Sequence, residues 1–357
     1  MKRLIQFRYR FDPGSGGAAG GSALIVVLWV IGIMSILIAS FSFDAHIETR
    51  IVSYYRKRAK AESLSKSGLE IARMLMAKSR DVSEDDEDED DRWLGNAKDL
   101  KNGVVRDLKE ELAGGTVTLN IIPEPARRNI NSLGSNDTEI EENLERILEV
   151  GGIPEDMWSE LIESFLDWTD KDDEARFDGG ETEDHYETLE PPYMAKNGPL
   201  DTVEELLLIK GFTRTILNGG TLKLNERDEE GIPVLGIGDL LTTYGSGKVN
   251  VNAASSRVLM TLYGVDELIA GAIIQDREGW IDADGEEEDN YYESAGDLFA
   301  RIPDLDASLS KNVETDSSIY RVSSVGEFGG VQREVWCIAA FDGKNKDLKI
   351  KRWREQD

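Results

Sequence analysis

The chain has very little cysteine and histidine. Of its 357 residues, one is a cysteine, Cys337, and two are histidines, His46 and His185. A single cysteine cannot form an intrachain disulfide. Two histidines are too few for a histidine-rich metal site, and they offer few candidates for the histidine of a Ser-His-Asp triad. The composition therefore excludes a disulfide-stapled scaffold and disfavours the enzyme classes that depend on histidine.

Positive charge is also scarce. The chain has 41 Lys and Arg against 70 Asp and Glu, so its net charge is −29. Such a surface repels phosphate backbones, which argues against a nucleic-acid-binding role, and it attracts cations such as calcium. The densest acidic run, residues 81–91 (DVSEDDEDEDD), predicts a solvated linker because like charges at this density resist compaction.

One segment carries no charge at all. Residues 22–43 (SALIVVLWVIGIMSILIASFSF) are long enough to span the hydrocarbon core of a bilayer. Basic residues precede this run and acidic residues follow it, which predicts a cytoplasmic N-terminus and an extracytoplasmic C-terminal domain. A secretory signal peptide is disfavoured because the run is long and no A-x-A cleavage pattern closes it. No other segment is apolar enough to enclose it as a core helix.

The helical pattern continues past the apolar run. Residues 44–78 contain no proline and a single glycine, Gly68, and their apolar residues recur near helical spacing. We therefore expect one helix from about Leu24 to Lys78, with its first half in lipid and its second half packed on the following domain. Small residues allow helices to approach closely in a membrane, so the expected helix-packing positions are Gly32, Ser35 and Ala39.

The remainder predicts an α+β architecture, with a terminal antiparallel sheet and a large helical insert. Alternating apolar residues predict strands at 113–123, 318–324, 334–341 and 348–353. Residues 201–211 predict an amphipathic helix that stops at Gly211. Two Asn-apolar-Asn triplets, at 129–131 and 250–252, each precede a helix, a glycine turn and a second helix. This pattern is a weak internal repeat.

The second repeat has the pattern of a helix-hairpin-helix unit, a module often found on DNA. Such modules hold phosphates with backbone amides at the glycine turn and with nearby Lys or Arg. The turn at Gly264 is instead followed by Asp266 and Glu267. These carboxylates repel phosphate, so we expect a structural hairpin and no nucleic-acid partner.

Acidic residues gather between Phe165 and Pro192. Asp170, Asp172 and Glu174 alternate just after a predicted helix, and Gly179-Gly180 lets the chain turn back toward a second acidic group, Glu181, Glu183 and Asp184. Asn197 adds a further oxygen. Hard oxygen ligands at such spacing can surround a cation, although the pattern is not an EF-hand loop.

Two other interpretations of this acidic segment remain open. A solvated acidic loop is common in a chain of this charge. A pair of carboxylates could instead hydrolyse a glycoside beside Trp168, Tyr186 and Tyr193. The catalytic interpretation is disfavoured because the acids are many and clustered, and because Trp168 has the pattern of a core residue.

The N-terminal sequence resembles the precursors of pilins. A glycine and a small residue that open an apolar helix are typical of prepilins, which a membrane peptidase cuts after the glycine before the new N-terminus is methylated. The cleavage site implied here lies between Gly21 and Ser22. The sequence around this site is similar to that of the K family of minor pseudopilins in type II secretion: Gly21-Ser22-Ala23-Leu24-Ile25-Val26-Val27-Leu28-Trp29. Most pilins have glutamate at the fifth mature position, and Val26 in its place is typical of the K family.

This resemblance implies a role and a set of partners. A subunit without the fifth-position carboxylate cannot neutralise the amine of a neighbour below it, which fits the tip of the pseudopilus. The implied partners are the I- and J-type minor pseudopilins, the major pseudopilin and the prepilin peptidase. The implied location is the inner membrane, with a periplasmic C-terminal domain that supports protein export. The family is structural, so no enzymatic activity is expected.

The resemblance also implies a calcium site and a domain plan. The stretch from Leu166 to Asn197 is similar to the calcium-binding part of the family's helical domain, and it implies a structural ion. The implied ligands are Asp170, Asp172, Asp173, Glu174, Glu183, Asp184 and Asn197. The expected segments are a leader (1–21), a transmembrane segment (22–43), the pseudopilin helix with an acidic loop and first strand (44–128), the helical insert (129–300) and the C-terminal strands (301–357).

A rival hypothesis needs no pilin-type processing. In it, the chain is a bitopic membrane-anchored binding module whose hairpins hold a peptide or a polysaccharide on an acidic, calcium-stabilised ectodomain. Retention of residues 1–21 in the mature protein would favour this alternative.

Overall fold

The structure, a computed structural model, describes residues 19–83, 86, 91–223, 231–279, 290–342 and 347–356. The chain divides into two compact units, Met1–Ala59 and Lys60–Asp357. Most of the expected leader, up to residue 18, and most of the acidic tract at 81–91 lie outside the described residues.

The first unit contains the N-terminal part of one long helix, α1 (Ala19–Lys78). Its large apolar side chains from Leu24 to Phe43 are at least half exposed on every side of the helix. A helix that is apolar all round is stable in lipid and not in water. Within the described residues, one helix is long and apolar enough to cross a membrane, and it is this one. The predicted long helix is confirmed.

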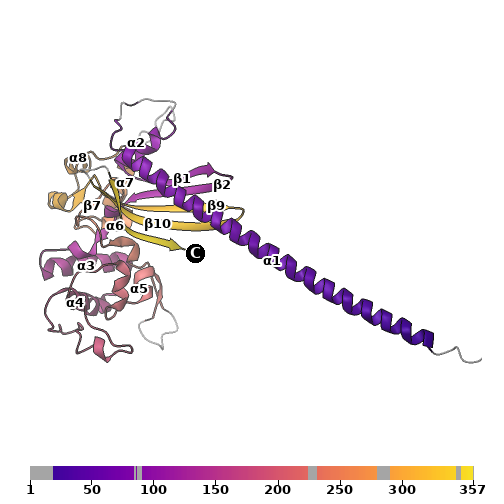
Figure 1. Cartoon of the computed structure of the whole chain (residues 1–357). Helices are drawn as coiled ribbons and strands as arrows, with labels where there is room; N and C mark the ends of the chain where they lie inside the picture. The colour runs from indigo at the N-terminus through magenta and orange to yellow at the C-terminus, as the bar shows by residue number, and fades with distance from the viewer. Residues whose placement is uncertain are drawn as a thin grey trace, which may run out of the picture. The chain divides into compact units, whose positions relative to one another are not determined.

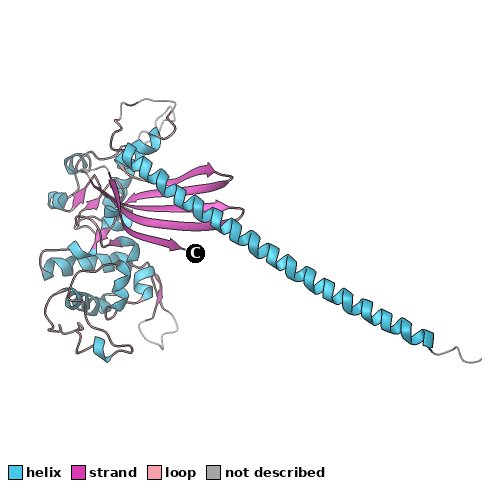
Figure 2. Ribbon diagram, in the orientation of Figure 1, coloured by secondary structure: helices cyan, strands magenta, loops and turns pink. Residues whose placement is uncertain are grey.

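The second unit is built on a five-stranded antiparallel sheet with the order β1-β2-β9-β10-β11 (Figures 1 and 2). Its strands are β1 (Val105–Leu112), β2 (Gly115–Pro123), β9 (Ile319–Phe328), β10 (Val331–Asp342) and β11 (Asp347–Gln356). The predicted strands and the C-terminal hairpin are confirmed. Strand β1 was not predicted, because its run VRDLKEEL is mostly charged and exposed.

The last turns of α1, from Lys60 onward, pack on one face of this sheet. Ala72, Leu75 and Met76 are buried there with Leu119 of β2 and Val322 of β9. The short helix α2 (Leu94–Asn102) follows α1 and leads into β1. The helix approaches the sheet closely because small residues meet at the contact, so the side-chain layer there is thin.

Gly326 is one of these small residues, and we expect its replacement by alanine to destabilise the protein. An added Cβ would overlap the carbonyl oxygen of Ala61 and lie 2.5 Å from the Ser65 nitrogen. Both are backbone atoms that cannot rotate away, so Gly326→Ala should cost about 1–3 kcal/mol. Urea unfolding of the full chain in detergent measures this. Gly95→Ala is the control, since a Cβ at Gly95 in α2 meets nothing within 4 Å. Equal midpoints for both variants would contradict the packing.

A large insert leaves the sheet between two neighbouring strands. It begins after Pro123 of β2, which pairs with Tyr320 at the start of β9. The expected limits, 129 and 300, fall inside this interval. Its α-helices are α3 (Asp137–Gly151), α4 (Trp158–Thr169), α5 (Arg214–Asn218), α6 (Ser256–Met260), α7 (Glu267–Arg277) and α8 (Ala295–Arg301).

Short elements complete the insert. The 3-10 helices are η1 (Glu124–Ala126), η2 (Ile130–Ser132), η3 (Glu155–Met157), η4 (Tyr186–Thr188), η5 (Val203–Leu208), η6 (Gly238–Leu240) and η7 (Ala307–Lys311). The short strands form three pairs: β3 (Arg128–Asn129) with β6 (Leu241–Thr242), β4 (Gly220–Leu222) with β5 (Ile232–Val234), and β7 (Val249–Asn250) with β8 (Val313–Glu314).

The internal repeat is present in the hydrogen bonds of the two Asn-apolar-Asn triplets. In each, the first asparagine accepts a bond from the amide of the second: Asn129 from Asn131 and Asn250 from Asn252. The second asparagine then holds a residue far along the chain by both its amide and its carbonyl oxygen. Asn131 holds Leu200 and Asn252 holds Tyr292, at 2.8–2.9 Å.

The helices of each repeat meet at equivalent glycines. Gly152 separates α3 from α4 and Gly264 separates α6 from α7, and both have φ of +71°. That left-handed conformation favours glycine and turns the chain sharply. The two repeats are therefore copies of one structural unit.

The predicted α-helix at 201–211 is wrong in type. The segment forms the 3-10 helix η5, which ends at Leu208. The hydroxyls of the buried Tyr186 and the partly exposed Tyr193 explain the difference, because they bind backbone groups that would pair with each other's neighbours in a longer helix. The Tyr193 hydroxyl donates to the carbonyl of Leu208, and the Tyr186 hydroxyl accepts from the amide of Lys210.

Candidate metal centre

Helix α4 ends in the acidic segment. Its apolar residues Leu161, Phe165 and Leu166 face the core of the insert, but Asp167 on the same helix is also fully buried. Asp170 follows at the C-terminal end of the helix, where its backbone amide still bonds to Leu166. A buried carboxylate needs partners, because removing its charge from water is costly.

Arg176 supplies most of these partners. Its guanidinium donates to Asp167 at 2.6 Å, to Asp170 at 2.7 Å and to Asp137 at 2.8 Å. The amides of Arg176 and Gly180 donate to Asp167 Oδ2 at 3.1 and 2.9 Å. The loop after α4 is therefore folded around the Asp167 carboxylate.

Three buried oxygens around this loop have no hydrogen-bond partner among the residues that the structure describes. They are Asp170 Oδ1, Glu181 Oε1 and Asn197 Oδ1. Buried acceptors without partners are rare and cost about 1–3 kcal/mol each. All three are hard oxygen donors of the type that calcium takes. Asn197 is held by bonds from its Nδ2 to the Asp172 carbonyl and to Asp173 Oδ1 at 3.2 and 2.9 Å, which leave its own oxygen free.

The electrostatics of these groups favour a cation. Burial raises the pKa of the Asp170 carboxyl, against the opposing effect of Arg176, and the charges of Asp172 and Asp167 add to the rise. Burial also raises the pKa of Glu181, together with the charges of Asp167, Asp170 and Asp173. These carboxylates therefore repel one another, and one arginine is shared among several of them.

The structure separates the predicted ligands into two groups. Asp170, Asp173 and Asn197 lie together at the loop, with the carbonyl of Asp172. Glu183 and Asp184 are exposed, and in the part of the chain that the structure describes no hydrogen bond or ion pair joins their side chains to this group. Glu174 is also exposed; its amide donates to Asp172 Oδ1.

Two acids outside the predicted ligand set also lie at this loop. Asp167 organises the loop, and Glu181 contributes one of the free oxygens. In the sequence, Asp167 is a charged residue within an apolar helical run (FLDWT), and this position could have indicated that it is buried. Among the described residues, no group of three or more Asp, Glu, His or Cys side chains has metal-binding geometry. A cation at this loop would therefore need other donors beside its carboxylates, such as the Asn197 amide, a backbone carbonyl or water.

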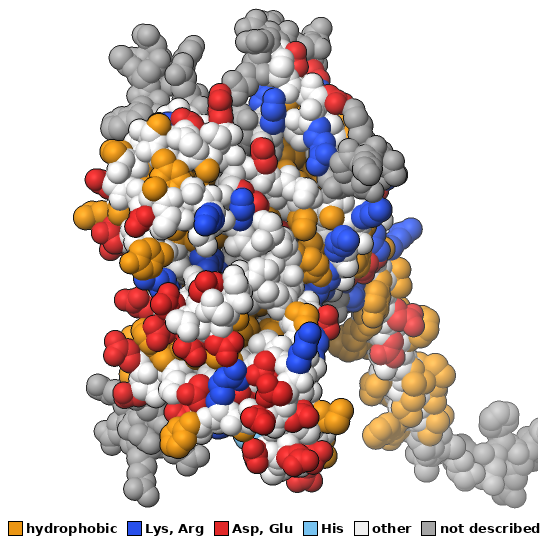
Figure 3. Space-filling model, turned by 90° about the vertical axis from the view of Figure 1, so that its left-hand side faces the viewer, with side chains coloured by type: hydrophobic (Ala, Val, Ile, Leu, Met, Phe, Trp, Pro, Cys, Tyr) orange, Lys and Arg blue, Asp and Glu red, His pale blue; other side chains and the backbone are white. Residues whose placement is uncertain are grey.

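The aromatic residues near the loop form core and no sugar platform. Trp168 and Tyr186 are buried with ring centroids 5.1 Å apart, and Tyr193 stacks on Tyr186 at 5.2 Å. Trp168 Nε1 donates to Glu205. Burial raises the pKa of the Tyr186 hydroxyl to about 12. The surface above this cluster is acidic: Figure 3 shows Asp and Glu side chains gathered over the part of the insert that holds α3 and α4.

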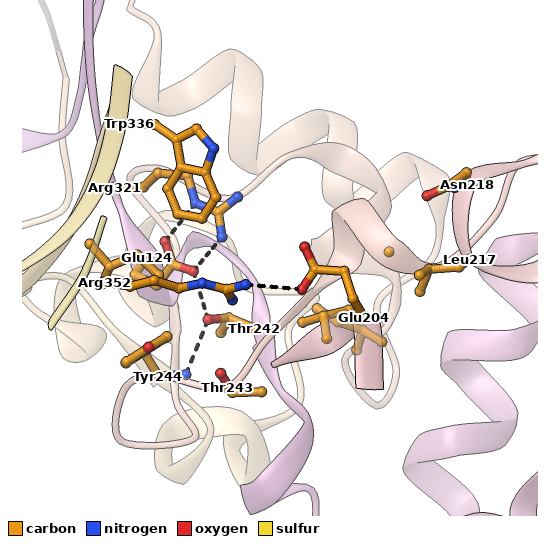
Figure 4. A pocket seen from close by; sticks show the side chains of 14 residues that line it. Glu124, Glu204, Leu217, Asn218, Thr242, Thr243, Tyr244, Arg321, Trp336 and Arg352 are labelled. Atoms are coloured by element: carbon orange, nitrogen blue, oxygen red, sulfur yellow. Dashed lines mark hydrogen bonds and ion pairs between the residues drawn. The ribbon is translucent and has the colours of Figure 1, made fainter. Parts of the chain in front are cut away.

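A second polar site joins the insert to the sheet (Figure 4). Glu124 is fully buried; it accepts two bonds from Arg321 at 2.8 and 3.0 Å and one from the Thr242 hydroxyl at 2.7 Å. Beside it is a cavity of about 130 Å³, and Arg352 points across this cavity toward Glu204, 3.5 Å away. Two cations lie close to Trp336, since Arg321 and Arg352 are 5.2 and 5.5 Å from its ring centre. All these charges are paired, so this site is a structural junction.

The N-terminal positions lie in α1. Gly21 and Ser22 are in its first turns. Gly32 lies in a shallow notch on the exposed helix, lined by Leu28, Trp29, Ile33 and Ile36. An added Cβ at Gly32 would meet nothing within 4 Å, and the Ser35 hydroxyl is bonded back to the Ile31 carbonyl at 2.8 Å. Gly32, Ser35 and Ala39 are thus exposed on the helix surface.

Comparison with known proteins gives two matches. Residues 126–219, which hold the first repeat and the acidic loop, match the family model described as type II secretion system (T2SS), protein K. A chain in the crystal structure of the GspK-GspI-GspJ complex from the enterotoxigenic Escherichia coli type 2 secretion system has the same fold, with a TM-score of 0.60 and 15% identity. The alignment covers 87% of this chain and 99% of that one. No curated protein matches the chain by sequence.

The two matches agree with each other and with the N-terminal resemblance. The family match lies within the insert, and the fold match extends over the sheet as well. Together they show that part of the insert is similar to type II secretion system protein K and that the chain has the fold of a chain in the GspK-GspI-GspJ complex.

Proposed function

We propose that this protein is a minor pseudopilin that caps the tip of the type II secretion pseudopilus and supports protein export across the outer membrane. The observation that carries the proposal is the position of the insert. The last turns of α1 run along the sheet from Gly326 and Gly115 toward Val322, and the insert leaves the sheet beyond this point, after Pro123. The insert lies at the end of the sheet and helix where the next subunit would stack. It therefore leaves that subunit no exposed sheet and helix for stacking.

The proposal includes membrane insertion and processing. The apolar part of α1 anchors the protein in the inner membrane, with the N-terminus cytoplasmic and the second unit periplasmic. The prepilin peptidase cuts between Gly21 and Ser22, and the new N-terminus is methylated. Val26 at the fifth mature position carries no carboxylate, so this subunit cannot neutralise the N-terminal amine of a neighbour below it, which fits a position at the tip. Its partners are the I- and J-type minor pseudopilins, followed by the major pseudopilin.

Processing at Gly21 gives a direct test of this function. In cells with the secretion system, the mature chain should begin at Ser22 and co-purify from detergent with the I- and J-type subunits. Gly21→Leu should abolish cleavage, because the peptidase requires the small residue, and the protein should then keep residues 1–21. N-terminal sequencing and intact mass measure both outcomes.

Gly16→Leu is the control for this experiment, since it changes a leader glycine away from the cut. It should be processed normally. A wild-type protein that retains residues 1–21 and finds neither partner would favour the rival binding module. A freely soluble species cut beyond Phe43 would exclude the membrane anchor altogether.

We further propose that the acidic loop binds calcium with a structural role. The support is the set of free buried oxygens on Asp170, Glu181 and Asn197, in a loop whose carboxylates repel one another. Arg176 provides one positive charge to several acids, and a divalent ion would provide further positive charge to the same acids. Asp173 and the Asp172 carbonyl lie at the same place and could complete the ligand set.

A further inference from the structure

Arg128 in β3 is a buried cation without a counter-charge. The residue is 3% exposed, and among the residues that the structure describes no carboxylate forms an ion pair with it. Its guanidinium makes one side-chain hydrogen bond, from Nη2 to Asn143 Oδ1 on α3 at 2.6 Å, and its buried Nε has no partner. Arginine is rarely buried in this way, because removing an unpaired charge from water is costly.

The second repeat shows that the fold itself does not require an arginine at this position. Arg128 and Val249 each come directly before the Asn-apolar-Asn triplet of their repeat. Arg128 pairs with Leu241 in a short parallel pair of strands, and Val249 pairs with Val313 in the same way. Val249 is fully buried. A valine therefore fills the equivalent position of the same structural unit, and packing alone does not account for the arginine.

A second arginine lies close to the first. Burial lowers the pKa of Arg128 to about 10, and the positive charge of Arg146 on α3 adds to the fall. Arg146 is partly exposed and lies over the ring of Tyr263, 4.7 Å from its centre, in the turn between α6 and α7. Glu142 and Glu149 are one turn away on α3, but within the described ranges neither forms an ion pair with Arg146. Two like charges therefore lie together without an acid between them.

The chemistry of this arginine pair suits an oxyanion. A guanidinium has five N–H donors in a planar fork, which matches the oxygens of a carboxylate or a phosphate group. Arg128 uses one of these donors on Asn143, and its Nε is left without an acceptor. An anion would give the buried charge its missing partner and would offset the repulsion between the two arginines. Solvent reaches Arg146, so the anion would enter beside that residue.

We propose that Arg128 and Arg146 form a binding site for an oxyanion, a carboxylate or a phosphate group, where the two repeats of the insert meet. Arg128 is the buried anchor of the site, and Arg146 closes it at the surface. Arg146 belongs to the first repeat and Tyr263 to the second, so an anion that fixes Arg146 also holds the two repeats together. The site depends neither on the membrane anchor nor on the proposed position at the pseudopilus tip.

Isothermal titration calorimetry of the full chain in detergent, without calcium, tests the site with two probes, inorganic phosphate and acetate. Wild type should bind at least one of them saturably, and the tighter of the two identifies the oxyanion. Arg128→Met keeps a long side chain without the charge, and it should abolish saturable binding. Arg146→Gln changes the partly exposed arginine, and it should weaken binding roughly tenfold or more, the loss expected for a charged hydrogen bond.

A control variant and a second measurement complete the test. Arg214→Gln removes an exposed arginine from α5 of the same insert, and it should bind like wild type. In urea without either probe, Arg128→Met should unfold at the wild-type midpoint or above it, because an apolar side chain replaces an unpaired buried charge. A large loss of stability in that variant would overturn the site, since it would show that the fold already satisfies Arg128. So would the absence of saturable binding of both probes, or wild-type affinity in either the Arg128 or the Arg146 variant.

Discussion

Replacing Glu124 by alanine should destabilise the second unit by about 3–5 kcal/mol, the typical cost of breaking a buried ion pair from one side. Glu124 has no exposed surface, and its removal leaves the Arg321 guanidinium without two hydrogen bonds and Thr242 without its acceptor. Arg127, whose Nη1 lies 3.6 Å from Glu124, also loses its counter-charge. Urea unfolding of the full chain in detergent measures the loss.

Glu204→Ala is the matched control for this prediction. Glu204 lines the same cavity and pairs with two arginines, Arg352 at 3.5 Å and Arg354 at 3.6 Å. These contacts are long and Glu204 is half exposed, so solvent screening should hold its contribution below about 1 kcal/mol. Equal losses for the two variants would show that burial of the Glu124 ion pair is not the decisive factor.

The Glu124 pair also predicts how stability depends on pH. Burial acts to raise the pKa of Glu124, but its bonds from Arg321, with Arg127 and Thr242, outweigh burial, and the pKa is lowered from 4.5. A carboxyl whose pKa is lower in the folded state stabilises the fold above the unfolded pKa. That contribution is lost as the pH falls below about 4.5. Wild type should therefore lose stability more steeply than Glu124→Gln between pH 4.5 and 3.

Local patterns in the sequence were enough to predict much of the fold. The uncharged run from Ser22 to Phe43 and the proline-free stretch after it predicted α1 from composition alone. Alternation predicted the β9–β10 hairpin and β11. The repeat was predicted from two Asn-apolar-Asn triplets, because each triplet makes its turn from its own side chains.

Features that depend on distant residues could not be predicted in this way. Glu124 and Arg321 are 197 residues apart, and nothing in either neighbourhood indicates the other. Strand β1 is too charged to show alternation. Strand β11 has a one-residue bulge at Lys351, which no propensity indicates.

The acidic loop shows the same limit at the level of single ligands. Its composition predicted a cation site, but the sequence could not say which acids turn inward. Asp167 and Glu181 are buried, whereas Glu183 and Asp184, close to Glu181 in the chain, are exposed. Burial there is decided by how the loop folds around Arg176, a contact set by tertiary packing.

Calcium should raise the thermal stability of the protein through this loop. A ligand that binds only the folded state at 100 times its Kd stabilises it by roughly 2.7 kcal/mol. For a unit of this size, that corresponds to a rise of about 4 °C in Tm. Thermal unfolding of the full chain in detergent, with calcium or with a chelator, measures the effect. Asp170→Asn and Glu181→Gln each remove the charge from a free buried oxygen, and each should abolish most of the rise.

Two further variants separate binding from folding. Glu183→Gln changes an exposed acid of the predicted ligand set, and it should keep the full calcium response. Asp167→Asn disturbs the bonds from Arg176 and Gly180, so it should lower Tm with or without calcium. Identical Tm values for wild type in calcium and in chelator would refute the site. If Glu183→Gln lost the calcium response, the ion would have to bind at the exposed acids. The loop would then close differently when calcium binds.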